Sequence, residues 1–281
     1  MEQYDLTPVV ELENEISPIE ALERANIDIQ IATAKKYPRS LVRVKSDMLT
    51  MATLDQETAA GCFYTLPARK GAENKKRIQG PSVRLAEIAV SSYGNIKAGA
   101  RIISDDGKFV TAQGVCHDVE KNVSISVEVK RRITDKMGRR YSDDMIQTTC
   151  QAACAIAYRN AVFKVVPLAL IQPVYEKAKE CAIGTAKTLT ERRAKAVEAF
   201  GKYGIEELRI LQALGKNSIE EIDLADVETL LGYFNAIKDS EISIDEVFPP
   251  VVKTPKLFGE KPSEKKEEKE QPAEDGKAVN G

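Results

Sequence analysis

The sequence contains a single histidine and no tryptophan, and aromatic residues make up only 6% of its 281 positions. No apolar run approaches the ~18–20 residues that a membrane-spanning helix requires. The segment 1–14 is acidic and lacks the basic and apolar regions of a secretory signal peptide. We therefore expect a cytoplasmic protein with no membrane partner. Its 43% of hydrophobic residues suffice for an ordinary globular core.

Signals for cofactors are also missing. The five cysteines include no CxxC pair, and Cys150 and Cys154 with one histidine make a poor zinc site, so we expect plain buried thiols. The glycines of segment 94–101 are not followed by the Gly-Lys-Ser/Thr of a phosphate-binding loop. His117 has no Ser or Cys partner motif. These observations predict neither a cofactor, nor a metal, nor a catalytic residue.

Charge is unevenly distributed along the chain. Residues 68–140 carry 16 basic and 8 acidic side chains, a net charge of +8, whereas residues 205–246 carry 3 basic and 11 acidic ones, a net charge of −8. A basic middle between acidic flanks favours a polyanion site in the middle, although an ordinary mixed surface is the alternative.

Helical signals dominate the first third and the second half of the chain. Ser17-Pro18-Ile19-Glu20 is a capping box with proline at the first helical position, and helical spacing continues to Pro38. The polar segment 68–79 is predicted to be a loop. Further helices are predicted over 41–51, from Asp55, from Gly80-Pro81 to Tyr93-Gly94, and over 148–165.

Between these helices the apolar period changes to two. Segment 96–103 alternates, Asp106-Gly107 is a hairpin signal, and segment 108–118 returns as a second strand. Segment 123–134 is the clearest strand, with one apolar and one charged face. A fourth strand is predicted over 139–146. We predict an antiparallel meander.

The predicted fold class is therefore α+β: an antiparallel β-meander flanked by helices, a small C-terminal helical module and a disordered tail. A second capping box at Thr188 and Glu191 opens the module, and the Pro-, Lys- and Glu-rich sequence beyond Pro249 predicts the tail. The predicted parts are an N-terminal helical segment 1–60, a meander and helix core 61–183, the module 184–248 and the tail 249–281.

Basic residues on alternate strand positions are the strongest functional signal. If the polar faces of the strands point the same way, cations line one surface where they can track phosphates, and a nearby aromatic residue can stack on a base. The alternative is solvated strand positions. The candidate DNA-binding residues are Lys97, Arg101, Lys130, Arg132, Arg139, Arg140, Tyr141, Arg159 and Lys164.

Two other functions remain open. Asp118 followed by Glu128-Val129-Lys130 resembles the D…ExK arrangement of metal-dependent nucleases, in which two carboxylates hold Mg²⁺. The hairpin places Asp118 and Glu128 roughly 10 Å or more apart at ~3.3 Å per residue, which disfavours this arrangement. The third possibility is an oligomeric scaffold without a DNA role.

The order of elements over residues 80–167 resembles the core of the single-strand annealing proteins. The resemblance is carried by Leu85-Ala86 and Tyr93-Gly94 of the helix before the hairpins, and by Arg159-Asn160-Ala161 of the alanine-rich helix after them. The superfamily includes the phage Erf and RecT groups and the eukaryotic Rad annealing protein. The resemblance implies that subunits form rings or filaments and act without ATP. It also implies that single-stranded DNA lies in a basic groove between sheet and helix.

Together, these observations predict a protein that binds single-stranded DNA and anneals complementary strands in homologous recombination, in the host cytoplasm if a phage encodes it. The expected partners are single-stranded DNA and further copies of the chain. The C-terminal module is expected to dock a single-strand binding protein or an exonuclease, with a solubilising appendage as the alternative.

Overall fold

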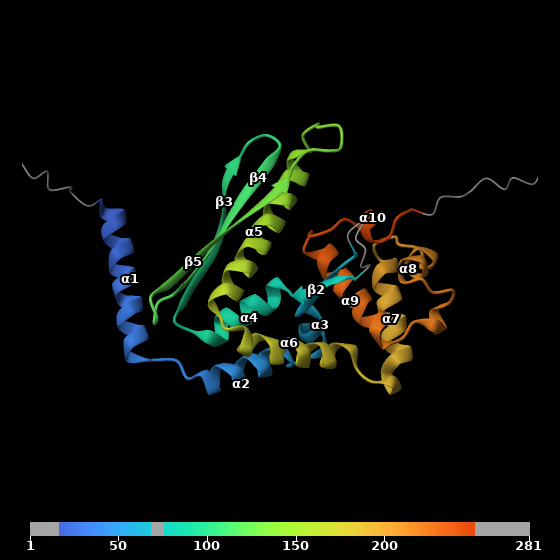
Figure 1. The fold of residues 1–281 in the computed structure, drawn as a ribbon, viewed down its shortest axis with the longest axis horizontal. Helices are drawn as coiled ribbons and strands as arrows, with labels where there is room; N and C mark the ends of the chain where they lie inside the picture. The colour runs from blue at the N-terminus through green and yellow to red at the C-terminus, as the bar shows by residue number, and fades with distance from the viewer. Residues whose placement is uncertain (1–16, 69–75, 251–281) are drawn as a thin grey trace, which may run out of the picture. The chain divides into compact units, whose positions relative to one another are not determined.

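The computed structural model describes residues 17–68 and 76–250 and confirms the α+β class. This part of the chain forms helices and two antiparallel sheets of two and three strands (Figure 1). The strands are β1 (Phe63–Leu66), β2 (Ile78–Pro81), β3 (Ile96–Asp105), β4 (Phe109–Asp118) and β5 (Val123–Arg132). The α-helices are α1 (Pro18–Lys36), α2 (Leu41–Ala52), α3 (Gln56–Gly61), α4 (Val83–Tyr93), α5 (Asp143–Val165), α6 (Leu168–Ile183), α7 (Leu189–Gly201), α8 (Glu207–Leu214), α9 (Leu224–Lys238) and α10 (Ile244–Val247).

The N-terminal helices begin at the predicted positions. The Ser17 hydroxyl accepts a hydrogen bond from the backbone N–H of Glu20, and the Glu20 carboxylate accepts one from the N–H of Ser17, which completes the capping box of α1. The Asp55 carboxylate caps α3 by accepting from the N–H of Thr58. Local sequence therefore suffices to start these helices.

The meander forms as predicted, in the order β3-β4-β5. Strand β4 lies in the centre, with Lys97 opposite His117 on one side and Ser124 opposite His117 on the other. The β3–β4 register shifts between Ile102 and Ser104. Because side chains alternate between the faces of a strand, this register determines which residues share a face.

Helix α5 covers one face of the meander (Figure 1). Its alanines allow close approach: Ala112 on β4 and Ala153 and Ala157 on α5 are completely buried against one another. A Cβ atom on Gly114 would lie 2.1 Å from the carbonyl oxygen of Ala157, so only glycine fits at this crossing.

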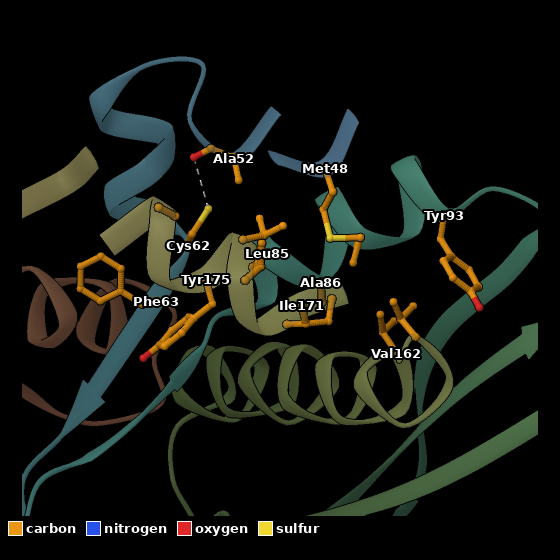
Figure 2. Close-up of a cluster of buried hydrophobic side chains, with 14 of the residues drawn as sticks. Met48, Ala52, Cys62, Phe63, Leu85, Ala86, Tyr93, Val162, Ile171 and Tyr175 are labelled. Carbon is orange, nitrogen blue, oxygen red and sulfur yellow. Dashed lines mark hydrogen bonds between the residues drawn. The ribbon is translucent and has the colours of Figure 1, made fainter. Parts of the chain in front are cut away.

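The main core lies beneath this layer, where α2, α4, α6 and the end of α5 meet (Figure 2). Met48, Leu85, Ile171 and Val162 come from these four helices and are fully buried. Burying one such large side chain contributes roughly 1.5–3 kcal/mol. Cys62 lies in the same core, where burial raises the pKa of its thiol to about 12, in keeping with a structural thiol.

The C-terminal module has its own apolar cluster, in which Phe200 and Phe248 meet edge to face with ring centroids 4.9 Å apart. The module nevertheless packs on the core, because α9 lies on β1. The Asn235 amide donates to the carbonyl oxygens of Ala60 and Phe63 at 2.6 and 2.7 Å. The described residues up to Pro250 form one compact unit, although the predicted boundary at 183/184 coincides with the end of α6.

Three local predictions are wrong. Segment 139–146 is not a strand, because only the single bridge between Thr134 and Arg140 forms before α5 begins. Gly80 and Pro81 do not open a helix but end β2, whose pairing with β1 the sequence analysis missed. Residues 69–75 of the predicted loop lie outside the described residues. Thr188 precedes α7 without capping it through its side chain; the capping box instead joins Thr185 and Thr188 in the 3-10 helix Ala186–Thr188.

Two further predictions concern the surroundings of the protein. Within residues 17–68 and 76–250, no helix is long and apolar enough to cross a membrane. Residues 251–281 of the tail predicted over 249–281 lie outside the described residues, and the cytoplasmic location stays a prediction.

Candidate nucleic-acid interface

The register gives the meander two chemically different faces. Helix α5 covers one face, whereas the other, here called the outer face, carries the strand residues of opposite parity. The outer face consists of Lys97, Gly99, Arg101 and, after the register shift, Ser104 on β3, Phe109, Thr111, Gln113, Val115 and His117 on β4, and Ser124, Ser126, Glu128, Lys130 and Arg132 on β5.

Four of the candidate DNA-binding residues share this outer face. Lys97, Arg101, Lys130 and Arg132 are all exposed, and Glu128 is the one acidic residue among those that make up the face. Their charges give the outer face a net charge of +3. The condition stated from the sequence, that the polar faces of the strands point the same way, is met.

The cations form a diagonal band across the sheet. Lys97 and Arg101 on β3 lie in the cross-strand rows of His117 and Gln113, whereas Lys130 and Arg132 on β5 lie in the rows of Thr111 and Phe109. From His117 to Phe109 the band extends about 26 Å at ~3.3 Å per residue. This length suits an extended polyanion better than a compact ligand.

A shallow groove of about 380 Å³ lies at the β3 end of the band, and its lining includes Lys97 and Arg101 on β3, Val115 and His117 on β4, and Ser124 on β5. Its floor is low at Gly99, where an added Cβ atom would meet nothing within 4 Å. The sugar or base of a bound nucleotide can therefore approach the protein backbone at Gly99, while the phosphates of the strand remain near the basic side chains.

An aromatic ring lies at the other end of the band. The Arg132 guanidinium lies 5.5 Å from the centroid of the Phe109 ring, on the outer face and beside Lys130. Phe109 is half-buried. An aromatic ring next to cations is the combination that single-stranded nucleic acid sites use to stack bases and hold phosphates.

The next three candidate residues lie beyond the end of β5. Arg139 pairs with Asp135 at 2.8 Å, and Arg140 pairs with Asp105 through two hydrogen bonds of 2.6 and 3.1 Å. This pairing holds the pKa of Asp105 at about 2, chiefly through the hydrogen bonds from Arg140. Tyr141 is half-buried beside them. Part of this basic charge is thus already neutralised within the protein.

The last two candidate residues lie on α5 and do not reach the outer face. The side chain of Arg159 is 8% exposed; it pairs with the carboxylate of Glu241 and lies 4.4 Å from the centroid of the Tyr64 ring. It therefore joins α5 to β1 and to the segment after α9. Lys164 is exposed near the C-terminal end of α5, the helix that covers the opposite face of the sheet.

The D…ExK residues are not brought together. Asp118 points to the α5 side of β4, whereas Glu128 and Lys130 lie on the outer face. Asp118 accepts two hydrogen bonds from the Arg39 guanidinium, at 2.5 and 2.7 Å. Burial alone would raise the pKa of Asp118, but these bonds and the charge of Arg39 hold it below its usual value. Asp118 thus anchors the segment between α1 and α2.

The described residues also lack any cluster of three or more His, Cys, Asp or Glu side chains placed to hold a metal ion. Asp118 and Glu128 lie on opposite faces of the sheet, so the two carboxylates are not placed to share a metal ion.

Sequence reasoning missed the contribution of β4 to the outer face. Phe109, Gln113 and His117 were not candidates, because β4 has apolar or small residues on both faces and shows no clean alternation. The pairing of these residues with the basic positions of β3 and β5 was the signal that could have identified them, and it requires the register.

Comparison with known proteins identifies no relative of this chain. No protein-family model, no curated protein and no solved structure matches it.

Proposed function

We propose that the outer face of the meander binds single-stranded DNA and presents it for pairing with a complementary strand, without ATP and without covalent chemistry. The observation that carries this proposal is the diagonal band of four exposed cations, with the groove at Gly99 at one end and Phe109 at the other. The resemblance of residues 80–167 to single-strand annealing proteins supports the annealing function but not this location, because it implies a groove between sheet and helix, whereas the outer face lies opposite α5.

Annealing requires little of the protein beyond this geometry. Cations that hold the phosphates lower the repulsion between two strands, and a shallow open face leaves base edges accessible to a complement. No activated water or bound metal is needed. A duplex, with its bases already paired, would gain only the phosphate contacts, so we expect single strands to bind more tightly.

The salt dependence of binding tests the proposed site. Each phosphate contact contributes about −0.7 to the slope of log K against log salt for single strands, so four contacts predict a slope near −2.8. Lys130→Ala/Arg132→Ala and Lys97→Ala/Arg101→Ala should each flatten the slope by about 1.4. Fluorescence anisotropy with a labelled oligothymidine at several salt concentrations measures this.

The matched control is Lys177→Ala/Lys202→Ala, which removes one exposed lysine on α6 and one directly after α7. This control should leave the slope unchanged. Equal slopes for all three double variants and the parent protein would remove the outer face from the proposal. Annealing of two complementary oligonucleotides, with EDTA and without ATP, should fall in parallel with binding.

Self-association is also part of the proposal. Ile19, Leu22 and Ile29 on α1 are 73%, 64% and 64% exposed, and Ala34 is the one buried residue that the described part of α1 contains. Exposed apolar residues on a helix this poorly packed favour a second copy of the chain as their cover. Leu22→Glu/Ile29→Glu should lower the mass measured by light scattering, whereas Arg24→Glu on the same helix should not.

The expectation that the C-terminal module docks a single-strand binding protein or an exonuclease is retained as a proposal. Its support is the compact module with its own apolar cluster.

A further inference from the structure

A second groove lies at the seam between the core and the C-terminal module. Helix α3 contributes Ala60 and Gly61 to its lining, α7 contributes Ala196, Ala199 and Phe200, and α9 contributes Leu230, Leu231 and Phe234. These side chains make the groove mostly apolar. Its volume is about 220 Å³, below the ~300 Å³ at which small-molecule sites usually begin. The groove thus suits one or two side chains of a peptide better than a cofactor.

Basic residues surround this apolar floor. Arg192 and Lys195 on α7 and Lys238 on α9 line the groove, against the single carboxylate of Glu57 on α3. Lys195 forms an exposed pair with Glu191, of a kind that contributes little to stability and is readily exchanged for another partner. Within the described residues Arg192 Nη1 is shielded from solvent and has no hydrogen-bond partner. The exposed ammonium groups of Lys195 and Lys238 are therefore the donors that the groove offers to a ligand.

The charge around the groove selects among polyanions. The module has a net charge of −8 over residues 205–246, which repels a long polyanion such as DNA over about a Debye length, ~8–10 Å. A short segment with two or three carboxylates contacts only the cationic rim. An apolar floor with a basic rim is thus complementary to an apolar side chain flanked by acidic residues.

We propose that this groove docks a partner protein through a short acidic peptide segment that carries an aromatic or large aliphatic anchor. The anchor packs on Ala199, Leu231 and Phe234, and the flanking carboxylates pair with Lys195, Lys238 and Arg192. The proposal rests on the docking role proposed for the C-terminal module but not on strand annealing, because none of these residues lies on the outer face.

Selection from a phage-displayed library of random 12-residue peptides on the full chain tests this. The selected peptides should carry an aromatic or aliphatic residue flanked by at least two Asp or Glu. Affinity is then measured by fluorescence anisotropy of one labelled peptide. Lys195→Glu/Lys238→Glu reverses the rim charge and Ala199→Trp fills the floor; each should weaken binding by about tenfold or more, equivalent to ~1.4 kcal/mol.

Lys202→Glu is the matched control, because it reverses an exposed charge directly after α7 that does not line the groove. It should leave peptide affinity unchanged, and none of the groove variants should change binding of oligothymidine. Peptides without acidic residues, or peptides that bind the groove variants as tightly as the parent protein, would overturn the proposal. Competition by oligothymidine would make the groove a nucleic-acid site instead. Competition by a synthetic peptide of residues 251–281 would make it a site for the chain's own tail.

Discussion

Two glycines of the meander allow the assignment of its faces to be tested directly. Gly114 on β4 faces α5, and a Cβ atom there would lie 2.1 Å from the carbonyl oxygen of Ala157, where real Cβ contacts do not come below 3.0 Å. Gly99 on β3 lies on the outer face, and a Cβ atom there would meet nothing within 4 Å. Gly114→Ala and Gly99→Ala therefore add the same methyl group to opposite faces of the same sheet.

The expected effects differ in sign. Accommodating the new methyl of Gly114→Ala requires the strand and helix to separate by about 1 Å, and overpacking of this kind costs roughly 1–3 kcal/mol or more. In a unit of this size 1 kcal/mol corresponds to ~2–4 °C, so the midpoint should fall by roughly 2 to 12 °C. Gly99→Ala should be neutral or stabilise by up to ~1 kcal/mol, because alanine loses less backbone entropy on folding.

Thermal and urea unfolding followed by circular dichroism measure both effects, with the urea m-value as a check that the unfolded state is unchanged. The reasoning would be refuted if Gly114→Ala were as stable as Gly99→Ala. In that case α5 would not cover the face that contains Gly114, and Lys97, Arg101, Lys130 and Arg132 would not form the open face of the sheet.

Three further predictions follow from buried and exposed carboxylates. Arg159→Ala should destabilise the protein by about 3–5 kcal/mol because it leaves the buried Glu241 carboxylate without its partner. In urea unfolding, Arg159→Ala/Glu241→Ala should lower the free energy of unfolding by less than the sum of the two single changes. Burial raises the pKa of Asp239 above its ordinary value of 3.8, so ionisation of Asp239 costs native stability as the pH rises above 3.8. Asp239→Asn should therefore be more stable than the parent protein at pH 7. Equal stability of the two proteins at pH 7 would contradict this. Below pH 3.8 the advantage should vanish, since the carboxyl is then protonated in both folded and unfolded chains. Glu128→Gln should tighten binding of oligothymidine and leave annealing intact, because it removes the acidic residue of the outer face, whereas Mg²⁺-dependent cleavage that this change abolishes would favour the nuclease alternative.

Local signals in the sequence were sufficient for most of the secondary structure. The Ser17 and Asp55 caps, the helical end at Gly94 and the alternation along 123–134 each depend on interactions within a few residues, so they could be predicted from neighbours alone. Alternation also determined that Lys130 and Arg132 share a face. The prediction over 139–146 failed because the Ser142 cap, which starts α5, outweighs a weak strand pattern.

The candidate site depended on long-range contacts. Whether Lys97 and Arg101 share a face with Lys130 and Arg132 is a matter of register, which hydrogen bonds to β4 determine. No pattern within β4 identifies Phe109 or His117 as members of that face. Arg159 shows the converse: its sequence context resembles a DNA-contacting helix, but the fold brings Glu241 to it from 82 residues away.

By itself, then, the sequence determined the elements, the meander and the uneven charge, because propensity, capping and period are local properties of the chain. Tertiary structure decided which face of the meander stays open and that α9 packs on β1 through Gly232. It also decided that an apolar groove with basic residues in its lining lies between the core and the module. These features arise where segments far apart in sequence meet, and their energies depend on the geometry of packing, which no single segment encodes.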